Sequence, residues 1–246
     1  MMPTQRASLA NAQRQHWQNT YRAHPGMYGS APSASAVYAA QVFRMARAEE
    51  VLELAAGHGR DALYLAQQGF RVLATDFSGV AIDQIQRTAQ AQGLTERISA
   101  VAHDLRDPLP TKTESVDAVH AHMALCMALS TNEIHAVLSE VRRVLRPGGT
   151  FVYTVRHVGD AHYGAGNPHG DDIYEHGGFA VHFFSEQLIE ALADGWIRDD
   201  FHAFEEGELP RRLWRLTLTK PHQDSPSNRS ECARLGRPQP PRWLEC

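Results

Sequence analysis

Short apolar runs and segments with helical spacing alternate along residues 50–155. The apolar runs predict strands near residues 50–55, 70–75, 97–102, 115–121 and 149–155. The segments between them predict helices near residues 60–68, 79–92 and 131–145, with helix stops at Gly93 and Pro147-Gly148-Gly149. Strands that alternate with helices favour right-handed crossovers and a parallel sheet that helices cover on both faces. The pattern therefore predicts a doubly wound α/β domain.

The pattern changes after residue 155. Residues 156–184 are rich in His, Gly and Tyr and show no clear period. A loop of this length in a compact domain is usually either functional or disordered, and the aromatic content here argues against disorder, so we predict a substrate lid. Ser185 to Ala193 predicts a capped helix. Ile197 to Phe204 and Leu213 to Lys220 predict two further strands, joined by the polar turn Glu205 to Pro210.

Two segments flank this domain. Residues 1–49 contain two predicted helices, Ala7 to Tyr21 and Ser35 to Ala48, on either side of a turn. Residues 221–246 contain five prolines and little apolar surface to bury, which is typical of a disordered or weakly docked tail. The sequence thus predicts a helical segment over 1–49, one domain over 50–220 and a tail over 221–246.

The candidate ligand site is the turn after the first predicted strand. The apolar run ends at Ala55-Ala56-Gly57-His58-Gly59, and helical spacing begins at Arg60. Glycines let the backbone come close to a ligand, and the unpaired N–H groups of a helix start favour an anionic group. Asp76 ends the next predicted strand, where a carboxylate can hold a ribose. This layout predicts a cofactor that contains a nucleotide.

Two cofactor classes fit the layout. Gly57-x-Gly59-x-x-Ala62, with Asp76 about 20 residues later, satisfies a loose dinucleotide fingerprint. Glu53, however, stands just before the turn, where its carboxylate would repel a pyrophosphate and attract an ammonium or sulfonium group. S-adenosylmethionine carries both cations, a carboxylate for the helix start and a ribose diol for Asp76. Glu53 therefore favours S-adenosylmethionine over NAD.

The stretch Glu53-Leu-Ala-Ala-Gly-His-Gly-Arg resembles the first motif, E/D-x-G-x-G-x-G, of class I S-adenosylmethionine-dependent methyltransferases, with Ala55 at the first glycine. Segments that resemble later motifs of the family follow in order at 74–78, 103–105, 115–122 and 145–151. The resemblance implies a mostly parallel, seven-stranded Rossmann-like sheet with a C-terminal antiparallel hairpin. It also implies a set of cofactor-binding residues: Glu53, Ala55, Gly57, Gly59, Asp76, Phe77, Asp104, Leu105 and Ala121.

Within this class, the chain is similar to the small enzymes related to tellurite-resistance and thiopurine methyltransferases, through residues 57–66 and an aromatic N-terminal segment. The likeness implies that the N-terminal segment lids the cofactor and that Arg60 closes over the methionine end. Trp17 and Tyr21 could contact the cofactor or only anchor the segment to the core. Tyr28, in a glycine-flanked turn, is the better candidate for ligand contact.

Methyl transfer from a sulfonium needs an aligned nucleophile, exclusion of water and, where the nucleophile carries a proton, a base. His122 is the candidate base, because imidazole titrates near neutral pH; the alternative is a structural histidine. Arg156 could bind an anionic substrate group, and the alternative is a salt bridge with Glu175 or Asp171. His157, which follows it directly, is the third candidate catalytic residue.

Charge, histidine spacing and cysteine content limit the partners, metals and compartment that we expect. With 24 basic and 28 acidic residues, the net charge of −4 gives no reason to expect a nucleic-acid partner. The histidines of residues 156–184 lack helical i, i+4 spacing, so we expect no metal. Cys126, Cys232 and Cys246 form no disulfide framework, and we expect Cys126 to be buried rather than nucleophilic. A reducing cytoplasm and no membrane partner are the simplest expectation.

These features predict an enzyme that moves a methyl group from S-adenosylmethionine to a small-molecule nucleophile. The identity of the acceptor and the oligomeric state stay open. One alternative is a protein that binds S-adenosylmethionine without catalysis. A less favoured alternative is an NAD-dependent oxidoreductase, for which the catalytic half lacks a Tyr-x-x-x-Lys pair.

Overall fold

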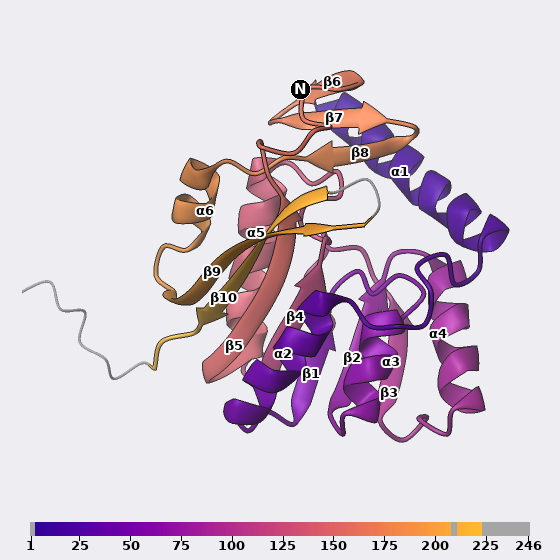
Figure 1. Cartoon of the computed structure of the whole chain (residues 1–246), viewed down its shortest axis with the longest axis vertical. Helices are drawn as coiled ribbons and strands as arrows, with labels where there is room; N and C mark the ends of the chain where they lie inside the picture. Colours follow the sequence, from indigo (N-terminus) through magenta and orange to yellow (C-terminus); the bar gives the residue numbers. More distant parts are fainter. Residues whose placement is uncertain (1–2, 208–210, 223–246) are drawn as a thin grey trace, which may run out of the picture.

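A seven-stranded sheet with strand order β3-β2-β1-β4-β5-β10-β9 forms the centre of the molecule (Figure 1). The computed structural model describes residues 3–207 and 211–222. The strands of this sheet are β1 (Glu50–Glu53), β2 (Arg71–Asp76), β3 (Ile98–Ala102), β4 (Val116–His122), β5 (Leu145–Arg156), β9 (Ile197–Glu206) and β10 (Arg211–Thr219). All five strands predicted between residues 50 and 155 are present, as are the two predicted after residue 196.

The strand pairing confirms the predicted architecture. β2 pairs in parallel with β3 and β1, and β4 pairs in parallel with β1 and β5. β10 runs antiparallel to both β5 and β9, so β9 and β10 form the expected closing hairpin. The strand order reverses between β1 and β4. In an open α/β sheet, ligands bind outside the carboxyl ends of the strands at such a reversal.

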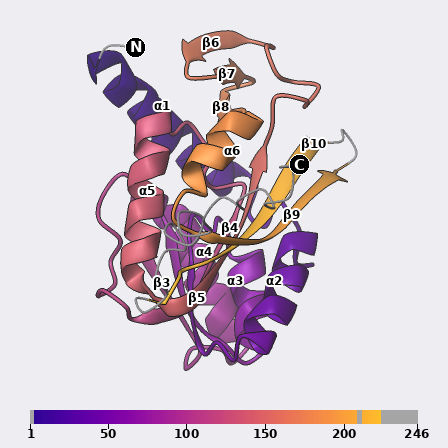
Figure 2. The same cartoon turned by 90° about the vertical axis from the view of Figure 1, so that its left-hand side faces the viewer.

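Helices cover both faces of this sheet (Figure 2). On one face lie α2 (Ala34–Met45), α3 (Arg60–Gln67) and α4 (Gly79–Ala91), which share one apolar cluster with β1 and β2. On the other face lie α5 (Thr131–Val144) and α6 (Glu186–Leu192), which share a second cluster with β4 and β5. The helices α3, α4 and α5 begin at the predicted residues, and serine caps explain several of the helix starts.

Those caps follow the expected chemistry. Ser33, Ser78 and Ser185 each accept a hydrogen bond from a backbone N–H in the first turn of the helix that follows. Ser130 forms a full capping box with Glu133 at the start of α5. The sequence therefore determines locally where α2, α4, α5 and α6 begin, whereas α3 begins after Gly59 without a side-chain cap.

The N-terminal helix α1 (Pro3–Ala23) is longer than the predicted Ala7 to Tyr21 and packs across the domain against α4 and β8 (Figure 1). Trp17 and Tyr21 are buried in a cluster with Ala81 of α4. The rings of Trp17 and Phe179 lie 4.9 Å apart. These contacts hold the N-terminal segment against two parts of the chain that are distant in sequence.

Residues 156–184 contain regular structure, which the sequence analysis did not predict. The strands β6 (Asn167–Gly170), β7 (Ile173–His176) and β8 (Phe179–His182) form a separate antiparallel sheet. Each strand has four residues, which is too short to show an alternating pattern. Glycines with positive φ, such as Gly170 and Gly177, stand at the turns. The glycines that suggested a loop are thus the turns of a small sheet.

Some predictions fall on residues that are not described. Residues 223–246, nearly all of the predicted tail, and residues 208–210 of the predicted polar turn lie outside the described part of the chain. Among the described residues, no helix is both long and apolar enough to cross a bilayer.

Candidate functional site

A cavity opens at the carboxyl ends of β1, β2 and β4, where the strand order reverses. The turn between β1 and α3 forms its floor, and α1 and the turn around Tyr28 form part of its wall. The loop after β4 and the first residue of β10, Arg211, line the opposite side. Elements from both ends of the chain thus meet around one space.

The glycine turn adopts a backbone that few residues tolerate. Ala55, Gly57 and Gly59 all have positive φ, at 49°, 58° and 90°. A side chain at Gly57 would meet the Tyr21 hydroxyl at 2.8 Å, and one at Gly59 would meet Ile85 at 2.5 Å. Gly57 therefore keeps the backbone accessible under α1, whereas Gly59 allows α4 to pack closely. Ala55 occupies the left-handed region at the position where the motif has its first glycine, at some cost in strain.

Asp76 lies at the other side of this turn and is 2% exposed. Its carboxylate accepts hydrogen bonds from the N–H groups of Gly57 and Ser78, at 2.9 and 2.8 Å. Burial raises the pKa of Asp76 to about 6, although these two N–H donors oppose the shift. Each carboxylate oxygen has a second lone pair, so Asp76 can still accept hydrogen bonds from the hydroxyls of a diol.

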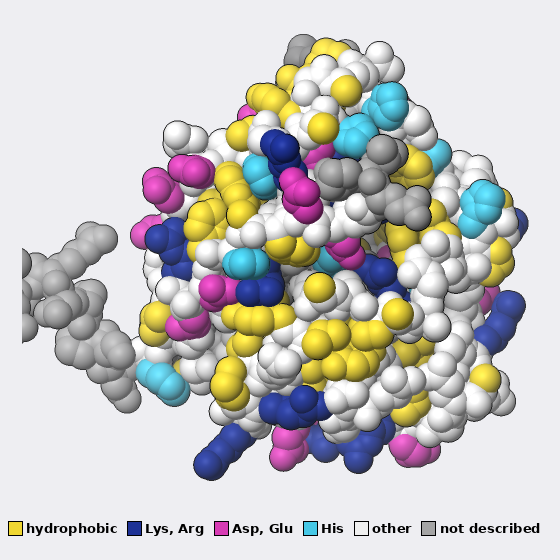
Figure 3. Space-filling view, in the orientation of Figure 1, with side chains coloured by type: hydrophobic (Ala, Val, Ile, Leu, Met, Phe, Trp, Pro, Cys, Tyr) yellow, Lys and Arg dark blue, Asp and Glu magenta, His cyan; other side chains and the backbone are white. Residues whose placement is uncertain are grey.

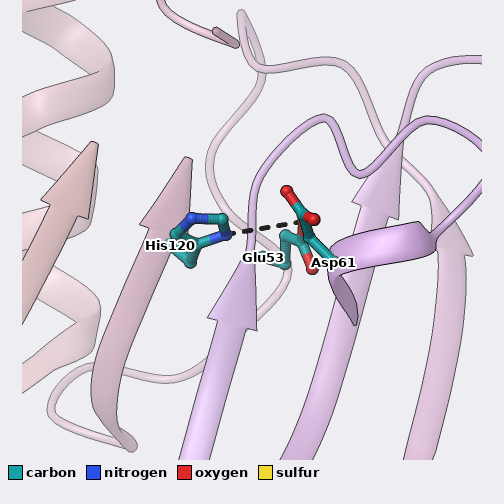
Figure 4. A group of neighbouring side chains, drawn as sticks. All are labelled: Glu53, Asp61 and His120. Carbon is teal, nitrogen blue, oxygen red and sulfur yellow. Dashed lines mark ion pairs between the residues drawn. The ribbon is translucent and has the colours of Figure 1, made fainter. Parts of the chain in front are cut away.

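Glu53, Asp61 and His120 form a buried polar cluster beside the turn (Figure 4). Their ligand atoms all lie within 4.8 Å of one another, a spacing that suits a cation. Asp61 already accepts hydrogen bonds from the N–H and hydroxyl of Ser33, both at 2.7 Å. Glu53 Oε2 has no hydrogen-bond partner among the described residues. Glu53 is therefore the carboxylate that is free to receive a cationic group, and an ammonium would fit it better than a metal that needs several ligands.

The wall beyond Asp76 contains Phe77, Asp104 and Leu105. Asp104 pairs with Arg14 of α1 and with Arg106, whose Nη1 lies 3.2 Å from Asp104 Oδ1. Burial opposes ionisation of Asp104, but the Arg106 N–H and the Arg14 guanidinium outweigh it and lower the pKa. Arg14 therefore ties α1 electrostatically to the wall of the cavity.

The turn and its neighbouring strands match a known family. Residues 51–149 match the model described as a methyltransferase domain. Over these residues the chain is similar to a methyltransferase domain. An uncharacterized methyltransferase of Synechocystis is 31% identical over 113 residues, which are 44% of this chain and 48% of that protein. The chain spans less than half the length of the curated relatives that it matches.

Solved structures share the fold over more of the chain. A 1,6-didemethyltoxoflavin-N1-methyltransferase of Burkholderia thailandensis, solved with bound S-adenosylhomocysteine, superposes with a TM-score of 0.68. It is 19% identical and covers 90% of this chain and 92% of that one. TehB of Haemophilus influenzae superposes with a TM-score of 0.61 at 16% identity, over 85% of this chain and 67% of that one. At these identities the likeness shows the fold, which is that of the predicted class.

Most of the cofactor-binding residues predicted for the methyltransferase domain line the cavity. These are Tyr28, Glu53, Ala55, Gly57, Arg60, Asp76, Phe77, Asp104 and Leu105. Gly59 and Ala121 are not among the lining residues. Gly59 lies against Ile85, and Ala121 is fully buried within β4, beside the lining residue His122.

The far end of the cavity contains His122, Met123 and Arg211. His122 Nδ1 lies 2.9 Å from the buried Thr154 hydroxyl, and its Nε2 lies 3.2 Å from Glu206 Oε2. The nearby His122 imidazole lowers the pKa of Glu206. His122 therefore has a polar neighbour at each ring nitrogen, a hydrogen bond at Nδ1 and an ion-pair contact at Nε2.

Arg156 and His157 do not reach this cavity. Arg156 forms a two-point ion pair with Asp160, four residues along the chain, rather than with Glu175 or Asp171. Its guanidinium also lies over Phe183, at 5.0 Å from the ring centroid. His157 stacks on Trp214 with ring centroids 4.3 Å apart. A nearby carboxylate and a nearby aromatic ring satisfy these two side chains outside the site, and neither partner is recognisable from spacing alone.

The remaining candidate, Cys126, is fully buried and hydrogen-bonds the Met123 carbonyl oxygen. Burial raises the pKa of its thiol to about 11, so a thiolate is disfavoured. Three residues that the sequence pattern does not single out lie at this end of the cavity: Arg211 lines it, and Thr154 and Glu206 contact His122. Glu206 and Arg211 lie at the two ends of the predicted β9–β10 turn. A search for charged residues at that turn could have found them.

Proposed function

We propose that this protein is an S-adenosylmethionine-dependent methyltransferase that acts on a small molecule. One observation carries the proposal: two buried carboxylates, Glu53 and Asp76, lie on neighbouring strands on either side of the Gly57 turn and line the same cavity. The match of residues 51–149 to a methyltransferase domain supports it.

The residues that line the cavity match the chemical groups of this cofactor one by one. The free Glu53 Oε2 suits the ammonium, and the Asp76 oxygens suit the ribose hydroxyls. Arg60, whose Nη2 lies 3.6 Å from Glu206 and which stacks over Tyr28, would face the amino-acid end. Phe77 and Leu105 offer apolar surface for a base. NAD fits less well, because its pyrophosphate would lie near Glu53. The cofactor, when bound, supplies a methyl group on a positively charged sulfur.

The N-terminal segment would act as the lid. Trp17 and Tyr21 line the cavity and also anchor α1 to Ala81, so they would combine the two roles considered for them. Tyr28 lies against His58, with ring centroids 5.8 Å apart, and its N–H donates to His58 Nε2 at 3.3 Å. Together these side chains would exclude water from the reacting groups, which strengthens electrostatic interactions inside the site.

The acceptor would bind at the end lined by His122, Met123 and Arg211. His122 would receive a proton from a nucleophile, and Glu206 would hold the ring and stabilise the resulting imidazolium. Thr154 fixes the other ring nitrogen. The chain's contribution is therefore to align the acceptor, exclude water and remove one proton.

The distribution of charge on the surface also favours a small-molecule acceptor over a nucleic acid. On the face in Figure 3, basic and acidic side chains are interspersed, and histidines are spread out rather than gathered into one patch. Nucleic-acid binding would favour a continuous basic surface. The three widely spaced cysteines favour a reducing cytoplasm as the compartment.

Competition binding tests this function. Labelled S-adenosylmethionine is equilibrated with the full chain, and unlabelled S-adenosylhomocysteine or NAD is added. Displacement by S-adenosylhomocysteine and not by NAD is the expected result. Displacement by NAD alone, or no retention of the label, would contradict the proposal.

A further inference from the structure

Glu53 and His120 face each other on the neighbouring strands β1 and β4, and neither is fully satisfied (Figure 4). Glu53 Oε1 lies 3.6 Å from His120 Nδ1, which is longer than an ordinary hydrogen bond. Glu53 Oε2 and His120 Nδ1 have no hydrogen-bond partner among the described residues. The two side chains are 2% and 0% exposed. Unsatisfied polar atoms at this depth are costly, which indicates a missing partner on the cavity side of Glu53.

The groups around Glu53 and His120 do not supply enough positive charge to balance the buried carboxylates. From α2, the Ser35 hydroxyl lies 3.2 Å from His120 Nε2. From α3, Asp61 adds a second buried carboxylate, held by Ser33. Arg60 is the nearby cation, but it lies 3.6 Å from both Asp61 and Glu206 and is shared between them. Two carboxylates, one imidazole and one shared guanidinium therefore lie close together beside the cavity.

A bound proton supplies part of the missing positive charge. Burial raises the pKa of Glu53 to about 7, with His120 opposing the shift and Asp61 adding to it. Burial lowers the pKa of His120, but the Glu53 carboxylate outweighs burial, and the net shift is upward. Glu53 thus titrates near neutral pH, and the two groups compete for protons as a coupled pair.

We propose that Glu53 and His120 share a proton in the ligand-free protein, and that the ammonium group of the cofactor displaces this proton into solvent when it binds. This inference rests on the proposed function. The ammonium replaces the proton as the positive partner of Glu53, so one cation exchanges for another and the buried charge stays balanced. An O–H or N–H bond of the pair breaks, and buffer takes up the proton. His120 acts as a positioning residue, because its own charge keeps the Glu53 proton exchangeable near neutral pH.

The proposal gives a defined pH dependence. Below the range in which the pair titrates, the ammonium must displace a proton, and affinity is reduced. As the pH rises through this range, affinity increases by up to about tenfold per pH unit, because one proton is released per ligand. A ligand without an ammonium group gains nothing from the exchange, so its affinity should not follow this curve.

Calorimetry measures the proton directly. S-adenosylhomocysteine is titrated into the full chain at pH 6.5, with EDTA, in buffers of different ionisation enthalpy. The slope of observed enthalpy against ionisation enthalpy gives the protons released. We expect roughly 0.5 to 1 proton per ligand at this pH, where the α-amino group of the ligand is still charged. Methylthioadenosine, which lacks the amino-acid end, should release almost none.

Variants test whether the released proton comes from Glu53 and His120. Glu53→Gln should abolish proton release, because glutamine does not titrate. His120→Asn should raise the pH at which release occurs, so that at pH 7.5 this variant releases at least about twice as many protons as the wild type. His182→Asn removes another buried histidine, which hydrogen-bonds the Leu129 carbonyl, and should leave the proton count unchanged.

The possible outcomes distinguish failure of the proton exchange from failure of the proposed function. Binding of S-adenosylhomocysteine without proton release, equal release with methylthioadenosine, or an unshifted profile in His120→Asn would overturn the proton exchange and leave the proposed function intact. Failure of the wild type to bind S-adenosylhomocysteine would overturn both.

Discussion

The imidazole of His122, at the end of β4, lies 3.2 Å from the carboxylate of Glu206, at the end of β9 (Nε2 to Oε2). β5 and β10 separate these two strands in the sheet, yet the contact joins them at their carboxyl ends. Thr154 holds the other ring nitrogen from β5. The closing hairpin therefore contributes a charged side chain to the site as well as two strands to the sheet.

Glu206→Gln tests this contact. The variant keeps the size of the side chain and removes the charge that would stabilise an imidazolium at His122. We expect turnover of an acceptor that carries a proton to fall by about 100-fold, with the affinity for S-adenosylhomocysteine nearly unchanged. Formation of S-adenosylhomocysteine measures turnover once an acceptor has been found. Glu205→Gln, at the exposed neighbour that pairs with Arg212, is the matched control and should retain full activity.

Gly57→Val should abolish cofactor binding. The residue has a φ of 58°, and its new side chain would meet the Tyr21 hydroxyl at 2.8 Å, between α1 and the turn. Titration with S-adenosylhomocysteine measures the loss. Gly79→Ala, where no heavy atom lies within 4 Å of the added carbon, should bind like the wild type. Unchanged binding by Gly57→Val would show that the turn is not the ligand site.

Glu53 should destabilise the ligand-free protein at neutral pH. Its pKa is about 7 in the folded protein and ordinarily 4.5, so the folded state binds more protons between these values, and stability falls as the pH rises through them. Glu53→Gln cannot ionise. We expect this variant to be more stable than the wild type at pH 8 by about 1–3 kcal/mol and the difference to shrink toward pH 4.5.

Chemical denaturation at several pH values measures this difference. Glu96→Gln, at an exposed turn, should show no comparable change with pH. A stability difference between wild type and Glu53→Gln that stays constant from pH 4.5 to 8 would contradict the proposed ionisation.

Cys126 should resist thiol reagents in the native state. It is fully buried, and its raised pKa of about 11 leaves almost no thiolate at pH 8. Peptide mapping after brief alkylation should find Cys126 modified only when denaturant is present. Rapid labelling of Cys126 in the native protein would show that it is accessible and would reopen its role as a nucleophile.

The sequence predicts most of the residues that line the Gly57 end of the cavity, because they come from segments that are local in the chain. Strand β1, the glycine turn and the start of α3 follow one another, and Asp76 ends the adjacent strand. Gly57 and Gly59 have positive φ values, and glycine is the residue type that such values favour, so these positions can be recognised in the sequence. The order of apolar runs likewise determines the parallel sheet.

The end of the cavity at His122 and Arg211 is less predictable because distant segments build it. His122, Glu206 and Arg211 come together only when β10 inserts beside β5, and no spacing in the chain indicates that contact. The position of Arg156 outside the cavity is hard to predict for the same reason: its partner Asp160 depends on how the chain turns after β5. The three four-residue strands after it are too short to produce a period.

The most direct measurement is calorimetric titration of S-adenosylhomocysteine into the wild type and into Asp76→Ala, with Asp83→Ala, an exposed change on α4, as control. The account predicts binding by the wild type and by Asp83→Ala. It predicts at least about tenfold weaker binding by Asp76→Ala, because the ribose loses its charged hydrogen-bond acceptor. Wild-type and Asp76→Ala proteins that bind equally well, or a wild type that does not bind, would contradict it.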